Sequence, residues 1–223
     1  MFFASLNGPV WFQKFDSVFQ IIFALVTIAI SMFSYKVFHF TKDKKFKYFS
    51  LAFIMVAIGY LINSFSNLLI YLGIYDGVLS SLHEFNLANA FFLASILFTL
   101  MGYMLLIIVS MDLKQKRLVA LLLAIILLFV AFSYQYFFKF HMVSFLLLSF
   151  ITWQYYENYH KKKTINAGLV FASFYMLSFA ELFFVGVMFF VWSYVIAHVM
   201  QLIGFGLLLT MFIKVVAHGR KKK

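Results

Sequence analysis

The sequence has no cysteine, one proline and few charged residues, and each shortage excludes a class of protein or structure. Without cysteine the chain forms no disulfide and holds no thiolate metal site, iron–sulfur cluster or cysteine nucleophile. The single proline, Pro9, precedes the long apolar stretches, so these contain no proline break. Charged residues are 11% of the 223 residues and hydrophobic residues 65%, which excludes a soluble domain with a polar surface.

The apolar stretches predict an all-α integral membrane protein with a single domain over residues 1–223. A bilayer core of about 30 Å needs roughly 20 apolar residues per helix, so this length accommodates about seven spans. The predicted seven-transmembrane-helix bundle has helices at 17–38, 48–72, 86–111, 117–135, 140–158, 165–188 and 191–214. The fourth and fifth stretches are the shortest, which leaves open a six-span alternative with one re-entrant hairpin.

Basic residues gather in alternate connections between the predicted helices. They lie around 36–47, 114–117, 161–163 and 214–223, and only Lys14 and Lys139 fall on the other side. The positive-inside rule therefore predicts a multi-pass protein of the cell membrane with its N-terminus outside and its C-terminus in the cytoplasm.

The net charge of +11 follows from this topology, so we expect no nucleic-acid partner. The basic connections favour anionic lipid at the inner face and offer a surface to a cytoplasmic protein partner.

Ionisable side chains within the predicted spans lie mainly toward the outer side. Glu181 precedes the last predicted turn by about seven residues and His198 follows it by about eight, so at 1.5 Å per residue both lie roughly 10 to 13 Å below the outer boundary. A carboxylate inside a membrane is costly and is treated as functional until a structural partner is shown. Whether the two residues line a site or only fasten the sixth helix to the seventh stays open.

Four amide side chains extend this candidate site. Asn63 and Asn67 are four residues apart and share a helical face, Asn89 lies near the outer end of the third predicted helix, and Gln201 follows His198 by three residues. The alternative is that such amides only join helices, at about 0.6 kcal/mol each.

The outward-facing polar cluster predicts a receptor-like or sensor-like membrane protein that binds a small ligand or ion from the outside. No sequence motif names a reaction, so we expect a protein without catalytic activity, although an enzyme stays open. Retinal is not expected, because a Schiff base needs a lysine within the seventh helix and Lys214 lies at its inner end.

A zinc-dependent membrane hydrolase is the first alternative. His198, Glu181 and His83 supply the nitrogen and oxygen ligands that zinc uses. No HExxH spacing occurs. The paired histidines found in the last helix of the alkaline ceramidase and adiponectin-receptor group are also missing, since Leu202 stands four residues after His198.

A small solute transporter with a 3+1+3 helix repeat is the second alternative. The segments LMGYMLL at 100–106 and LIGFGLL at 202–208 align over the third and seventh predicted helices, as in the parallel repeat of SWEET sugar transporters. The absence of proline within the spans argues against this function, because alternating-access helices often contain proline breaks.

Overall fold

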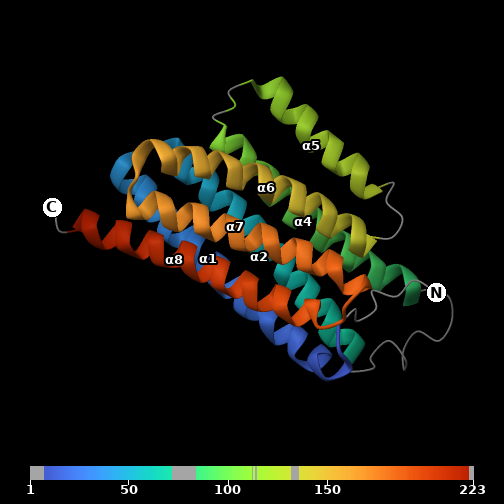
Figure 1. The fold of residues 1–223 in the computed structure, drawn as a ribbon. Helices are drawn as coiled ribbons and strands as arrows, with labels where there is room; N and C mark the ends of the chain where they lie inside the picture. Colours follow the sequence, from blue (N-terminus) through green and yellow to red (C-terminus); the bar gives the residue numbers. More distant parts are fainter. Residues whose placement is uncertain (1–7, 72–83, 112, 114, 132–135, 221–223) are drawn as a thin grey trace.

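The computed structural model describes residues 8–71, 84–111, 113, 115–131 and 136–220. These residues form α1 (Val10–Thr41), α2 (Lys44–Tyr71), α4 (Glu84–Ser110), α5 (Lys116–Ala131), α6 (Tyr136–Lys162), α7 (Ile165–Val185), the short 3₁₀ helix η1 (Gly186–Met188) and α8 (Ser193–Arg220) (Figure 1). Six of the described helices, all but α5 and η1, are long and apolar enough to cross a membrane. The expectation of an all-α, multi-pass membrane bundle is thereby confirmed.

Several helices continue beyond the apolar stretches from which they were predicted. α2 begins at Lys44, and α8 runs to Arg220. Backbone hydrogen bonding sets such ends: α1 stops where Lys42 takes the left-handed conformation (φ 57°) and its N–H donates to Phe38 O at 2.8 Å. Hydropathy predicts the part of a helix that can lie in lipid. The end of the helix is set by its backbone hydrogen bonds and its capping residue.

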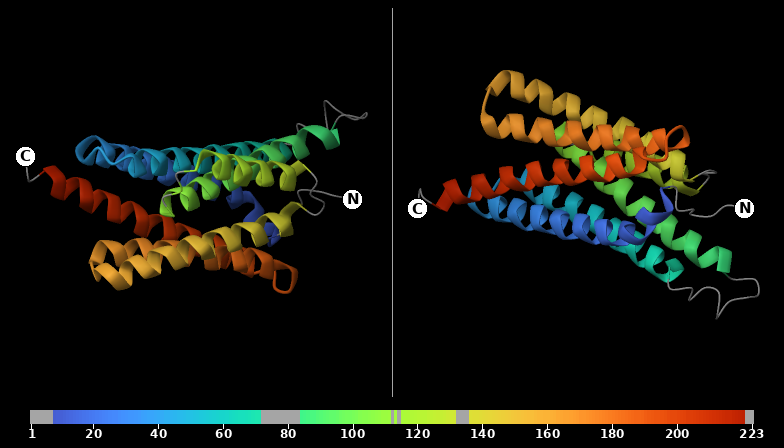
Figure 2. Two further views of the ribbon diagram at one scale, coloured as in Figure 1. Left: turned by 90° about the horizontal axis from the view of Figure 1, so that it is seen from above. Right: turned by 60° about the horizontal axis from the view of Figure 1, so that its bottom comes forward.

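Six helices form a closed ring in the order α1, α2, α4, α6, α7, α8 and back to α1 (Figures 1 and 2). α5 lies outside the ring and packs against α4 (Figure 1). The ring encloses an apolar core, whose largest fully buried side chains include Tyr103, Phe23, Phe53, Phe174 and Phe205. Exposed leucines, isoleucines and phenylalanines cover the outside of the helices, as expected for a surface that lipid solvates.

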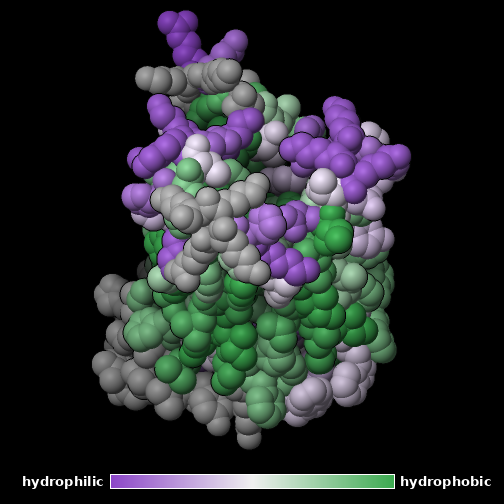
Figure 3. Space-filling view, turned by 90° about the vertical axis from the view of Figure 1, so that its left-hand side faces the viewer, coloured by the Kyte–Doolittle hydropathy of each residue, from purple (hydrophilic) through white to green (hydrophobic). Residues whose placement is uncertain are grey.

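The two ends of the bundle differ in charge. The turns after α1 and α6 and the end of α8 lie together at one end, which carries exposed lysines such as Lys42, Lys44 and Lys161–Lys163 (Figure 1). Hydrophilic side chains gather over these helix ends in the upper part of Figure 3, and mostly apolar side chains cover the described surface below them. The opposite end has the exposed apolar turn Met188–Trp192, with the Trp192 ring 5.8 Å from that of Trp11.

The α1–α2 and α6–α7 hairpins have matching turns. Lys42 and Lys163, 121 positions apart, both have positive φ values, 57° and 49°. Each N–H donates to the carbonyl oxygen four residues earlier at 2.8 Å. The next residue, Asp43 or Thr164, accepts a backbone N–H of the following helix through its side chain, at 2.9 and 3.3 Å.

α4 packs against α2 in the same way as α8 packs against α7. A Cβ atom built on Gly102 of α4 would lie 2.8 Å from Ala52 O of α2, and one on Gly204 of α8 would lie 3.1 Å from Ser173 O of α7. Ala52 and Ser173 are again 121 positions apart. The ring therefore consists of two three-helix units, α1–α2–α4 (the first triplet) and α6–α7–α8 (the second triplet), that meet at the α1–α8 and α4–α6 contacts.

Candidate functional site

Asp16 of α1 has a buried carboxyl group with four hydrogen-bond partners. Its Oδ1 accepts from Tyr194 OH and lies 2.9 Å from His198 Nε2, the same distance as from Tyr194 OH. Its Oδ2 accepts from Asn67 Nδ2 at 2.7 Å and from Gln20 Nε2 at 3.0 Å. The partners come from α1, α2 and α8, so one carboxyl group, on a residue that is 3% exposed, ties three helices together.

The Asp16–His198 pair holds one proton along the line that joins its nitrogen and oxygen. His198 Nδ1 lies 2.9 Å from Tyr194 O, and a carbonyl oxygen only accepts, so Nδ1 carries a hydrogen. The 2.9 Å contact from Nε2 to Asp16 then needs a second proton, either on the imidazole or on the carboxyl group. In both cases the pair is neutral overall, which suits a site closed to water.

Glu181 of α7 forms the second buried pair. Its Oε2 lies 2.6 Å from His141 Nδ1 of α6, and its Oε1 accepts from Gln201 Nε2 of α8 at 3.4 Å. Tyr103 of α4 and Tyr60 of α2 are near enough to Glu181 to interact with it electrostatically. Glu181 is 1% exposed, so its surroundings are side chains of α4, α6 and α8.

One phenyl ring lies between the two histidines. Phe184 of α7 stacks on His141, with ring centroids 4.4 Å apart, and meets His198 edge-on at 5.0 Å. Phe12, Phe19 and Phe23 of α1 complete an aromatic wall around His198. The two pairs are thus parts of one buried site, in which hydrogen-bonded polar groups are surrounded by aromatic rings.

Two buried polar atoms of this region have no hydrogen-bond partner within the described part of the chain. They are Gln20 Oε1, beside Asp16, and Ser144 Oγ, three residues after His141. Buried polar atoms are almost always paired with protein or with ordered water. These two atoms are therefore exceptions among the buried polar atoms of the described residues.

The residues predicted for the site divide into three groups. Glu181, His198, Gln201 and Asn67 all belong to the two hydrogen-bond networks. Asn63 is half-buried one turn before Asn67 and is not among the donors to Asp16. The side chain of Asn89 and the whole of His83 lie outside the described residues.

Glu181 and His198 do not form the simple pair that their matching depth suggested. Each is bonded to a different partner, His141 for Glu181 and Asp16 for His198. Depth along a helix follows from the sequence, but the rotation that selects a partner depends on packing. The signal for the missing partners is present in the sequence, because Asp16 and His141 also lie in apolar helices, where an ionisable group needs a partner.

The three proposed zinc ligands are not assembled among the described residues. In that part of the chain no group of three or more His, Asp and Glu side chains is placed to hold a metal ion. Zinc binding through His83 lies outside the described residues and stays a prediction.

The chain matches no known family model, no curated protein and no solved structure.

Proposed function

We propose that the protein is a receptor-like or sensor-like membrane module that binds a small ligand or ion, including the proton, in the outer half of its bundle. The observation that supports this most directly is the pair of buried histidine–carboxylate contacts, Asp16–His198 and His141–Glu181. Histidine changes its charge in the physiological pH range, and a buried pair responds strongly to any added charge.

The position of the site supports a role in switching. Asp16 belongs to the first triplet, and its partners His198 and Tyr194 belong to the second. A change in protonation or occupancy therefore changes contacts between the two halves. Helices α1, α7 and α8 continue from this site to the basic end, where a cytoplasmic protein partner would receive the signal.

The proposed topology places this site outside and the basic end in the cytoplasm. Exposed lysines gather at one end of the bundle, as the positive-inside rule requires. α5 is part of the same proposal: α4 ends at the basic end and α6 begins at the opposite end, so α5 belongs to the connection between the two ends (Figure 1). We propose it as a short seventh span, with 16 residues that cover about 24 Å.

Thermal unfolding of the purified protein in detergent tests the proposal. The unfolding temperature is measured between about pH 5 and about pH 8, and at neutral pH with added sodium, zinc, ammonium or acetate ions. We expect at least one of these conditions to shift the unfolding temperature of the native chain. The shift should be lost in Asp16→Asn and in Glu181→Gln.

Glu157→Gln is the matched control. Glu157 is an exposed carboxylate near the basic end that accepts a hydrogen bond from Trp153 Nε1 at 2.8 Å. This variant should keep the full shift. A native chain that responds to none of these conditions, or site variants that respond as Glu157→Gln does, would contradict the proposal.

Transport is the second candidate function, and the matching triplets are the observation that favours it. Two similar three-helix units with an additional helix outside the ring correspond to a 3+1+3 repeat, and repeats of this kind support alternating access in transporters. A proton gradient across proteoliposomes separates the two candidates. A proton-coupled transporter dissipates the gradient and Asp16→Asn abolishes the flux, whereas a sensor leaves the gradient intact.

A further inference from the structure

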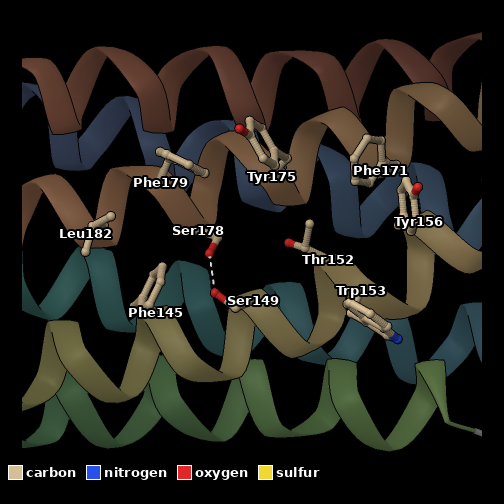
Figure 4. Close-up of a pocket in the computed structure, with 10 residues that line it drawn as sticks. All are labelled: Phe145, Ser149, Thr152, Trp153, Tyr156, Phe171, Tyr175, Ser178, Phe179 and Leu182. Atoms are coloured by element: carbon tan, nitrogen blue, oxygen red, sulfur yellow. Dashed lines mark hydrogen bonds between the residues drawn. The ribbon is translucent and has the colours of Figure 1, made fainter.

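A groove opens on the outside of the ring between α6 and α7. Phe145, Ser149, Thr152, Trp153 and Tyr156 line it from α6, and Phe171, Tyr175, Ser178, Phe179 and Leu182 line it from α7 (Figure 4). Trp153 is 61% exposed and Tyr175 43%, so the groove faces outward and not into the core. His141 and Glu181 of the same two helices are buried inside the bundle and do not line this groove.

The groove has the shape and surface of a site for a hydrocarbon tail. Its lining covers 11 residue steps along each helix, which corresponds to about 16 Å. Its serine and threonine hydroxyl groups already have partners: Ser149 Oγ and Ser178 Oγ bond to each other at 2.7 Å (Figure 4), and Thr152 Oγ1 donates to Leu148 O. The rest of the lining is apolar or aromatic, so the groove favours an apolar ligand.

The basic end of the groove supplies a site for a negative charge. Tyr156 and Phe171 line the groove on either side of the α6–α7 turn, which carries the exposed lysines Lys161, Lys162 and Lys163. One carboxylate lies nearby, Glu157, and it already accepts a hydrogen bond from Trp153 Nε1. Positive charge therefore exceeds negative charge at this end.

We propose that the α6–α7 groove binds one anionic phospholipid, with a tail along the aromatic lining and the phosphate group at Lys161–Lys163. Each cation near an anionic headgroup contributes an attraction that the zwitterionic lipids lack. Tryptophan and tyrosine side chains are favoured at headgroup depth, where Trp153 and Tyr156 lie one to two turns before the lysines. The site thus combines a groove that fits a tail with a charge that selects the headgroup.

Photolabelling with a phosphatidylglycerol that carries a reactive group in its tail tests this proposal. The full chain is reconstituted in vesicles of phosphatidylcholine with a small fraction of the probe, and the labelled peptides are mapped. We expect labelling to concentrate in residues 145–182. A phosphatidylcholine probe with the same tail should label this region far less.

Two variants separate the charge from the groove. Replacing Lys161, Lys162 and Lys163 by Gln should reduce labelling by phosphatidylglycerol by about fivefold per lysine, whereas replacing Lys221, Lys222 and Lys223 removes equal charge and should leave it unchanged. Trp153→Ala with Tyr175→Ala should reduce labelling by both lipids. Phe15→Ala with Phe65→Ala, two other exposed aromatic positions, is the control for that variant.

Three outcomes overturn the proposal. The first is labelling spread evenly over the apolar outer face. The second is equal labelling by the two lipids in the native chain. The third is a stable dimer that protects the groove from both probes, which would assign the surface to a second copy of the chain.

Discussion

Asp16 links three helices because each of its two carboxyl oxygens has two hydrogen-bond partners. Within a membrane no water replaces a lost partner, so an ionised or shared-proton carboxylate must find all its donors in the protein. Tyr194, His198, Asn67 and Gln20 provide them. A residue that looks like an isolated charge near the start of an apolar stretch is thus the best-satisfied acceptor among the described side chains.

Asp16→Asn should destabilise the protein by about 3 to 5 kcal/mol, because it leaves His198 and Tyr194 facing an amide that cannot match the carboxylate. The free energy of unfolding in detergent is the measurement. Asp16→Asn combined with His198→Gln should recover part of the loss, since no half of the pair is then left buried alone.

The control for this prediction is Glu157→Gln, whose exposed position predicts a change within about 0.5 kcal/mol. An equal loss in Asp16→Asn and Glu157→Gln would show that the buried pair contributes nothing beyond its charge.

Close helix packing depends on glycine at a few positions. A Cβ atom on Gly102 would lie 2.6 Å from Val56 Cγ2 and 2.8 Å from Ala52 O, whereas one on Gly206 would meet nothing within 4 Å. Small residues let membrane helices approach each other closely, and dispersion contacts then stabilise the interface. Gly102 allows this close approach at the α2–α4 interface, and Gly204 allows it at the α7–α8 interface.

Gly102→Ala should therefore cost about 1 to 3 kcal/mol of stability, because the backbone of α2 must move away from α4. Gly206→Ala is the matched control on the repeat-related helix α8. It should be neutral or stabilise the protein by up to about 1 kcal/mol through helix propensity. Unfolding of each variant in detergent measures both effects, and equal values for the two would contradict the packing argument.

At the hairpin turns, in contrast, a substitution by glycine is expected to raise the stability of the protein. Lys163 has φ 49°, a conformation that costs a residue with a Cβ about 1 kcal/mol or more, while glycine adopts it freely. Lys163→Gly should stabilise the protein relative to Lys163→Ala, which removes the same charge but keeps the Cβ. A lower unfolding temperature for the glycine variant than for the alanine variant would show that the turn is not strained.

At the scale of the whole molecule, the ring of two triplets has one basic end and one apolar-aromatic end. Lysines and arginines anchor a bundle on its cytoplasmic side, and tryptophan favours the interface. The absence of cysteine makes this arrangement directly measurable, since a single introduced cysteine is the only reactive thiol in the chain.

Phe189→Cys and Lys162→Cys probe the two ends, because both residues are exposed. A membrane-impermeant maleimide added to intact cells should label the cysteine at 189, and the cysteine at 162 only after the membrane is permeabilised. The reverse pattern would invert the proposed topology and place the histidine–carboxylate pairs in the inner half.

The sequence by itself determined the class of this protein and much of its architecture. Runs of about 20 apolar residues can only be spanning helices, so composition and length predicted a helical membrane bundle, and lysine clusters marked its turns. The same reasoning identified Glu181 and His198 as residues that need partners, because the cost of burying a charge does not depend on the fold.

Only the tertiary structure decided which partners they have. The rotation of each helix about its axis selects Asp16 for His198 and His141 for Glu181, and in these helices apolar residues cover every face, so hydropathy carries no record of rotation. Tyr60 of α2 and Glu181 of α7 occupy equivalent positions in the two triplets, because they are 121 positions apart, as Ala52 and Ser173 are. This equivalence likewise depends on contacts between distant segments. The cost of burying a charge requires that it be paired, but the packing of the helices determines which residue is its partner.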